Sequence, residues 1–247
     1  MALLDYTRRA MLAAGTATAI ALSAISLSAQ TPDDVLVVGQ IAEPKALDPA
    51  AVTAVNDFRI LMNLYDGLVR YKDGTLEVEP ALATSWDISD DGTVYTFSLR
   101  QDVKFHDGSD FNADAVKFNF DRMLDEAHPY HNTGPFPLSF FFSAIVSVEV
   151  VDSMTVKFTL NAPYAPFLSN LAYPTGLIVS PDAVAKHGTD FGRNPSGTGA
   201  FKFGEWRSNE AVVVEANSSH WEGAPKLQAV VFRPITDRPM DLELRAC

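Results

Sequence analysis

Two segments in the middle of the chain alternate apolar and polar side chains on either side of a tight turn. In residues 93–99, Tyr95, Phe97 and Leu99 alternate with polar or smaller residues, and the preceding turn is Asp-Asp-Gly. A period of two is that of a strand with one buried face, and Asp-Gly is a turn sequence. The sequence therefore predicts an antiparallel hairpin over residues 84–99, and with it a sheet that must bury one face.

A second hairpin is predicted by residues 145–151 and 155–160. The second segment alternates Val156, Phe158 and Leu160 with threonine and lysine, and Asp-Ser lies in the turn between the two. Further strands are expected at 35–41, 200–206, 211–216 and 229–234. The first is a continuous apolar run, which is typical of a buried strand.

Three helices are predicted between these strands. Residues 54–66 form the first, which ends before Gly67 and has an expected apolar face of Val55, Phe58, Met62 and Tyr65. Asn112 is expected to cap the second, whose apolar face holds Val116, Phe120, Met123 and Leu124. The third begins at Ser-Pro-Asp, 180–182, and ends at Gly188. The fold class is α/β, with strands and helices mixed.

The first residues are predicted to be an export signal. Arg8 and Arg9 precede a weakly hydrophobic, uncharged apolar stretch at 10–27, and small residues before Gln30 suit cleavage behind Ala29. We assign 1–29 as a signal peptide. The paired arginines also resemble a twin-arginine signal, and the sequence leaves the Sec and twin-arginine routes open. A retained membrane anchor is the alternative.

Charge and cysteine content exclude several classes of partner. The net charge is −12, so the chain lacks the cationic surface that nucleic acid binding requires. The single cysteine, Cys247, is the last residue, so neither an internal disulfide nor a cysteine-based zinc site is expected. No cysteine follows the signal to carry a lipid. We expect a free periplasmic protein, monomeric, without cofactor or metal.

Several ordered strings resemble one family of receptors. They are EPKALDP at 43–49, LYDGL at 64–68, PALATSW at 80–86, DGTVYTF at 91–97, LRQDVKFHDG at 99–108, FNADAV at 111–116 and GTGAF at 197–201. Trp206, Asn217 and Trp221 extend the likeness. Together they resemble solute-binding protein family 5, the dipeptide, oligopeptide, glutathione and nickel receptors of ABC importers.

The resemblance implies a type II periplasmic binding protein-like fold, with only the first lobe present and the second lobe missing. We expect that lobe at 30–236, with a main subdomain at 31–51 and 165–236 and an inserted one at 52–164. Residues 237–247 do not resemble the family, so a truncated or frameshifted product with impaired binding is expected. The resemblance also implies a peptide or related solute as ligand, and a permease and ATPase as partners.

The resemblance implies candidate ligand contacts at two places. The segment after the Leu-Asp-Pro string lines the cleft in such receptors, which nominates Thr53, Ala54 and Val55, where backbone groups bond an extended peptide. The alternative for Val55 is the core face of the helix. The loop after the capped helix also approaches the ligand in such receptors, which makes Tyr130 and His131 candidates. The alternative is that this loop is only solvated.

Other residues favour structural roles. Trp86, Trp206 and Trp221 lie in or beside strands and are expected to pack in the core. Asp48 is expected to bind backbone amides of its own loop, and Asp107 to serve a turn. His128 and His131 have metal-ligand spacing, but Pro129 breaks the helix that would align them.

Two other functions stay open beside solute binding. A secreted hydrolase would need a catalytic arrangement, and the chain holds no nucleophile elbow and no zinc-protease helix motif. The second alternative is a sensory module, in which the lobe serves as a surface for interaction with other molecules and not for transport. The identity of the ligand is also open. We predict a binding protein and no enzyme.

Overall fold

The computed structural model describes residues 32–235. The predicted signal at 1–29 and the divergent segment at 237–247 lie outside these described residues, as do the two arginines of the signal. Within residues 32–235, none of the helices combines the length and the apolar character that crossing a membrane demands.

The first sheet joins the two ends of the described chain. Its order is β1-β10-β9-β8, made of β1 (Val35–Gln40), β10 (Ala229–Pro234), β9 (Ala211–Ala216) and β8 (Phe201–Arg207). β1 runs parallel to β10, and the other pairs are antiparallel. All four predicted strands are confirmed. The expected burial of the first is wrong, because β1 is an edge strand on which Leu36 and Val37 are 47% and 41% exposed.

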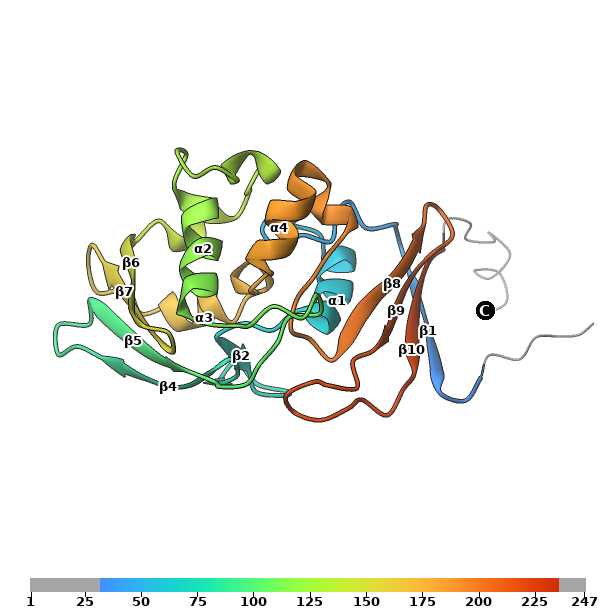
Figure 1. The fold of residues 1–247 in the computed structure, drawn as a ribbon, viewed down its shortest axis with the longest axis horizontal. Helices are drawn as coiled ribbons and strands as arrows, with labels where there is room; N and C mark the ends of the chain where they lie inside the picture. Colours follow the sequence, from blue (N-terminus) through green and yellow to red (C-terminus); the bar gives the residue numbers. More distant parts are fainter. Residues whose placement is uncertain (1–31, 236–247) are drawn as a thin grey trace, which may run out of the picture. The chain divides into compact units, whose positions relative to one another are not determined.

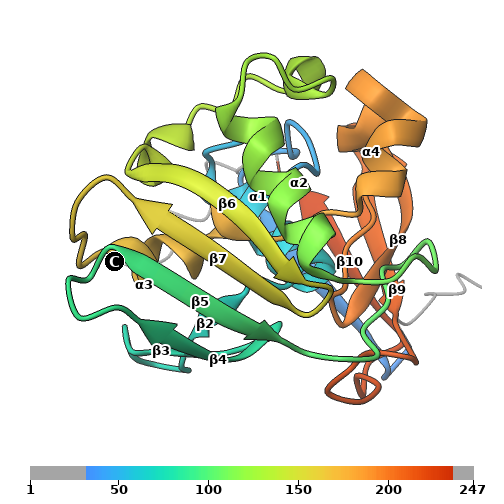
Figure 2. The same cartoon turned by 60° about the vertical axis from the view of Figure 1, so that its left-hand side comes forward.

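The second sheet contains both predicted hairpins. Its order is β4-β5-β7-β6, made of β4 (Ala83–Ile88), β5 (Val94–Leu99), β7 (Thr155–Leu160) and β6 (Ile145–Asp152), with every pair antiparallel. The alternation has the expected effect, since Tyr95, Phe97 and Leu99 are buried. Figure 2 shows this sheet with α2 (Ala113–Leu124) lying along it.

The helices begin where their capping residues indicate. Asn112 accepts the amide of Ala115 at 2.9 Å at the start of α2. Ser180 accepts the amide of Ala183 at 3.2 Å and begins α4 (Pro181–His187), and Gly188 ends it at a φ of 54°. α1 (Val55–Leu64) agrees with its predicted range.

The predicted apolar face of α1 is partly wrong. Val55 and Met62 are each 65% exposed, whereas Phe58, Ile60, Leu61 and Leu64 are buried. The helix is rotated so that a different set of apolar residues, at the same three- and four-residue spacing, meets the core.

Short elements complete the lobe. They are the two-stranded sheet of β2 (Val69–Tyr71) and β3 (Val78–Pro80), the helix α3 (Phe167–Leu171), and four 3₁₀ helices at His131–Thr133, Ser139–Phe142, Pro174–Gly176 and Gly188–Arg193. Each spans too few residues to show a period in the sequence.

Two apolar clusters hold the described residues together. One forms around α2 and the second sheet, where Phe120 packs edge-on against Phe142 and Phe158, with ring centroids 5.1 and 5.0 Å apart. The other joins α1 and α4 to the first sheet. Figure 1 shows β8, β9, β10 and β1 at one end and β4 to β7 at the other. The division between 31–51 with 165–236 and 52–164 stays a prediction, and α1 packs with the first sheet.

Candidate functional site

A buried ion pair connects the two chain segments in which ligand contacts are predicted. Arg122, near the end of α2, donates from both terminal nitrogens to the carboxylate of Asp48, at 2.9 and 3.1 Å. Their side chains are 1% and 2% exposed. Asp48 also accepts the amide of Ala50 at 3.0 Å, which confirms its expected role in its own loop.

The loop between β1 and α1 is held by further bonds from the core. Asp57, in the first turn of α1, accepts the amide of Lys45 at 3.1 Å, and the buried hydroxyl of Tyr65 donates to the carbonyl of Leu47 at 2.7 Å. Burial raises the pKa of Asp57, because a charged carboxylate is poorly solvated there. This loop is therefore fixed by side chains on the helix that follows it.

The loop after α2 is fixed by the same arginine. Arg122 donates to the hydroxyl of Thr133 at 3.3 Å, and that hydroxyl donates to the carbonyl of Tyr130 at 2.7 Å. The Nδ1 atom of His131 lies 3.0 Å from the carbonyl oxygen of Arg122. A Cβ added to Gly134 would lie 3.1 Å from that of Ala51, so the two loops touch.

The predicted contact residues lie in or directly beside these two loops, with Val55 at the start of α1 and His131 at the start of a 3₁₀ helix, at different depths. Thr53 and Val55 are exposed, and Ala54 is half-buried at the N-cap position of α1. Val55 is thus absent from the core face, contrary to the structural alternative. Tyr130 and His131 are half-buried, with their rings against Phe118 at 5.8 Å and Phe136 at 5.3 Å.

The chemistry of these loops suits non-covalent contact. Val55 and Met62 are two helical turns apart, so both lie on the exposed face of α1. The charged Arg59 lies between them on the same face. Within the described residues, no group of three or more His, Cys, Asp or Glu side chains has metal-binding geometry. His128 packs edge-on against Phe118 at 5.1 Å.

The tryptophans pack as predicted. Trp86 and Trp221 lie against the cluster around α2, and Trp206 lies against the other cluster.

The carboxylate of Asp66 is held by several side chains. Trp221 donates to Asp66 at 2.9 Å, and Thr198 donates to the same oxygen at 2.8 Å. Burial raises the pKa of Asp66, but the neighbouring His220 ring and the hydrogen bonds from Trp221 and Thr198 together outweigh it and hold that pKa below its ordinary value. His220 lies 3.7 Å from this carboxylate, which is too long for a hydrogen bond.

A half-buried histidine, His106, holds the Gly-Thr-Gly turn against the core. His106 accepts the amide of Gly197 at Nδ1 and donates from Nε2 to the carbonyl of Gly199 at 3.0 Å. Burial lowers the pKa of His106 to about 4, so the ring is neutral near pH 7. Asp107 accepts the amide of Ser109 at 3.0 Å, which confirms its turn role.

Sequence reasoning missed Arg122 and Asp57. Arg122 lies on the flank of α2 beside its apolar face, a position that the helical period marks only weakly. Asp57 reads as an ordinary acidic residue in a first turn. Their partners are 74 and 12 residues away, so the pairings follow from the fold alone.

Comparison with known proteins gives consistent matches. The model of bacterial extracellular solute-binding proteins, family 5 Middle, matches residues 77–246, a range that runs through most of the segment 237–247. The glutathione-binding protein GsiB of Pectobacterium atrosepticum is 37% identical over 238 residues, which are 96% of this chain and 44% of that protein. Di/tripeptide-binding protein 2 of Pseudomonas aeruginosa is 38% identical over 87% of this chain and 43% of that protein.

A solved structure agrees with the fold. The periplasmic binding protein DppA of Helicobacter pylori, in complex with the peptide STSA, superposes with a TM-score of 0.78 at 38% identity, over 85% of this chain and 44% of that one. The chain therefore spans less than half the length of these relatives. Because the family model covers more than half of this chain, and these relatives agree with it in sequence and fold, the chain belongs to the bacterial extracellular solute-binding proteins, family 5.

Proposed function

We propose that this chain provides one wall of the ligand site of an ABC importer's solute-binding component. The observation that carries the proposal is the likeness to the STSA-bound DppA, at 38% identity and a TM-score of 0.78. Likeness to glutathione-binding and di/tripeptide-binding proteins supports a peptide or related solute as the ligand. Family membership favours binding over hydrolysis or sensing, and we propose no reaction.

The ligand contacts proposed are Thr53, Ala54, Val55, Tyr130 and His131. The buried Arg122–Asp48 pair supports the grouping, because it ties the two loops that carry these residues to one point in the core. An extended peptide beside Thr53 to Val55 would use backbone hydrogen bonds, with Val55 as apolar contact. The proposed setting is the periplasm, with a permease and an ATPase as partners and the chain itself a monomer.

The test is a titration of the ¹⁵N-labelled chain with the tetrapeptide STSA and, separately, with glutathione. We expect amide shifts at residues 53–55 and 130–131. Binding by one wall of a site is weak, because the ligand stays partly hydrated. The probe should therefore be titrated to concentrations of about 1 to 10 mM.

A matched pair of variants sharpens the test. Val55 and Val146 are each 65% exposed, so Val55→Asp and Val146→Asp introduce the same charge at equally open sites. Val55→Asp should abolish the shifts with both probes, and Val146→Asp should leave them intact. Shifts confined to other parts of the chain, or none at all, would refute the proposed contacts.

A further inference from the structure

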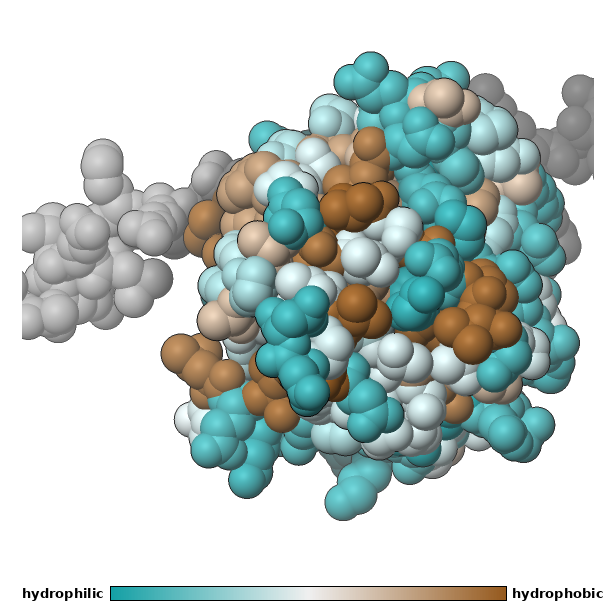
Figure 3. Space-filling view, turned by 90° about the vertical axis from the view of Figure 1, so that its left-hand side faces the viewer, coloured by the Kyte–Doolittle hydropathy of each residue, from teal (hydrophilic) through white to brown (hydrophobic). Residues whose placement is uncertain are grey.

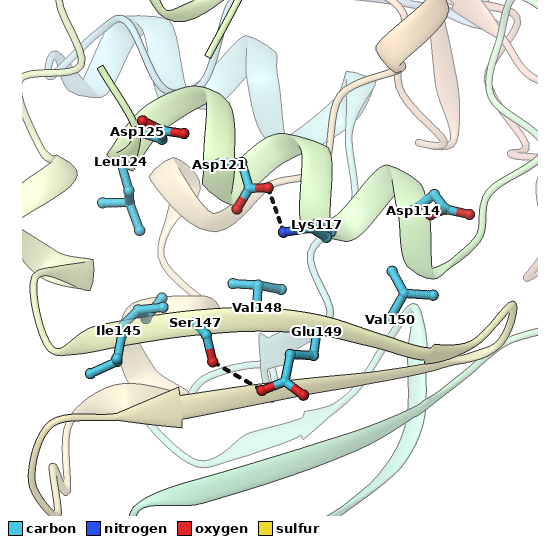
Figure 4. A pocket seen from close by; sticks show the side chains of 11 residues that line it. Asp114, Lys117, Asp121, Leu124, Asp125, Ile145, Ser147, Val148, Glu149 and Val150 are labelled. Atoms are coloured by element: carbon cyan, nitrogen blue, oxygen red, sulfur yellow. Dashed lines mark hydrogen bonds and ion pairs between the residues drawn. The ribbon is translucent and has the colours of Figure 1, made fainter. Parts of the chain in front are cut away.

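A groove runs between α2 and β6 and shares no lining residue with the proposed ligand contacts. It encloses about 810 Å³. The α2 side is lined by Asp114, Lys117, Asp121, Leu124 and Asp125, and the β6 side by residues 145–150. Figure 4 shows the helix and the strand running alongside each other, with Asp114 near Val150 and Leu124 near Ile145.

The groove follows a free strand edge. β6 is the last strand in the order β4-β5-β7-β6, so it pairs on one side only. Neighbouring side chains of a strand point to opposite faces, yet six consecutive residues of β6 line the groove. The groove therefore runs along the edge of β6, where alternate backbone N–H and C=O groups point away from β7.

The lining has an apolar floor. In Figure 4, Leu124 points from α2 toward the strand, and Val148 and Val150 point from β6 toward the helix. Val146 is 65% exposed on this strand, and Val151, just beyond the groove, is 57% exposed. On this side of the molecule, apolar surface lies in several spots between hydrophilic ones, as Figure 3 shows. A strand added here would cover part of that surface.

The charge of the groove selects its occupant. Four carboxylates line it, and one ammonium, that of Lys117, which is bound to Asp121 at 2.6 Å. Glu149 is bound by Lys157 at 2.8 Å. Among the ion pairs of the described residues, none includes Asp114 or Asp125. A second copy of this chain would bring like charges together, since the net charge is −12.

Asp114 and Asp125, the carboxylates outside these ion pairs, are spaced to fit an extended segment, and Asp125 also accepts the amide of Ala127 at 2.9 Å. Asp114 and Asp125 are eleven positions apart on α2, or about 16 Å at a rise of about 1.5 Å per residue. A strand covers that distance in about five residues at about 3.3 Å each. Basic side chains at alternate positions of such a strand would all face the helix.

We propose that the α2–β6 groove is a docking site for an extended lysine- or arginine-bearing segment of a partner protein, which adds to the second sheet as a strand beside β6. Backbone bonds to the free edge provide affinity, and Asp114 and Asp125 select for basic side chains. This inference does not depend on the proposed ligand site.

The test uses the purified chain and a fluorescein-labelled Lys-Val-Lys-Val-Lys-Val-Lys peptide, followed by fluorescence anisotropy and by amide shifts. We expect saturable binding, with shifts at 145–150 and none at 53–55. The double variant Asp114→Asn/Asp125→Asn removes both of these negative charges and should weaken binding about fivefold or more. The matched control, Glu77→Gln/Asp87→Asn, removes two exposed charges elsewhere and should change binding less than about twofold.

Two further peptides separate strand addition from charge attraction alone. A version N-methylated at alternate backbone nitrogens keeps every lysine and loses the donors, and we expect it to bind about fivefold or more weakly. The Glu-Val counterpart should not bind. Equal binding of the methylated peptide, equal weakening by both pairs of substitutions, or shifts at 53–55 in place of 145–150 would each overturn the proposal.

Discussion

Arg122 and Asp48, 74 residues apart, share two hydrogen bonds of 2.9 and 3.1 Å in a place where neither side chain reaches solvent. A buried ion pair of this kind adds little net stability, but a single unpaired charge left in its place is costly. The pair thus acts mainly by fixing where two loops meet.

Replacing one partner of this pair should be worse than replacing both. We expect Arg122→Met to lower the free energy of unfolding by about 3 to 5 kcal/mol, because Asp48 stays buried without a counter-charge. The double variant Arg122→Met/Asp48→Asn should be more stable than Arg122→Met alone by about 1 kcal/mol or more. Urea unfolding of the wild type and the two variants measures this, and a double variant no more stable than Arg122→Met would contradict it.

Gly197 should not tolerate a side chain. An added Cβ would lie 2.3 Å from both the carbonyl oxygen of Leu64 and a ring carbon of Tyr65, and the former is backbone. We expect Gly197→Ala to cost about 2 to 4 kcal/mol, since α1 must shift to make room. Gly74→Ala is the control. Gly74 has a φ of 73° and open space around it, so only the backbone strain of about 1 kcal/mol applies. Equal melting temperatures for the two variants would be inconsistent with this packing.

Acid should destabilise the fold through His106. The folded pKa is about 4 and the ordinary value is 6.5, so between these values the unfolded chain binds more protons. Stability is therefore full above about pH 6.5 and falls as the pH drops toward 4, by about 2 to 3 kcal/mol from this group. His106→Gln retains a donor for Gly199 and removes the titration. Urea midpoints at several pH values should show a shallower slope for this variant, and an unchanged slope would exclude His106 as the cause.

The cap of α2 should contribute measurably to stability. Asn112→Ala leaves the amide of Ala115 without its 2.9 Å acceptor, and we expect a loss of about 1 kcal/mol. Asn112→Asp keeps an acceptor there and should lose at most a few tenths. Hydrogen exchange at the first turn of α2 reports this locally. Identical hydrogen-exchange protection in Asn112→Ala and Asn112→Asp would mean that the cap does not contribute to stability.

The sequence predicted the parts of the fold that depend on local pattern. Both hairpins and the starts of α2 and α4 follow from side-chain alternation and from Asn112 and Ser180, because these signals act within a few residues. The rotation of α1 was beyond this reasoning. Its apolar residues satisfy two overlapping faces, and only tertiary packing selects Ile60 and Leu61 over Val55 and Met62.

The candidate site was predictable only by position. A resemblance nominated Thr53 to Val55 and Tyr130 by position, and the structure has Thr53 and Tyr130 on two loops that touch at Ala51 and Gly134, with Val55 at the start of α1. What fixes those loops is Arg122, whose partner no local pattern indicates. The groove beside β6 also depends on strand order, which places Asp114 and Val150 together although the sequence separates them.

The parallel pairing of β1 with β10 has a consequence for how the chain folds while it is being synthesised. Residues 35–40 leave the ribosome early, yet their hydrogen-bonding neighbours are residues 229–234. Until residues 229–234 have been synthesised, the first strand is therefore an unpaired apolar segment, and its pairing with β10 forms only after they emerge. Such long-range pairing slows folding, and it leaves the apolar surface of the first strand open to aggregation or to chaperones during the interval between the two strands.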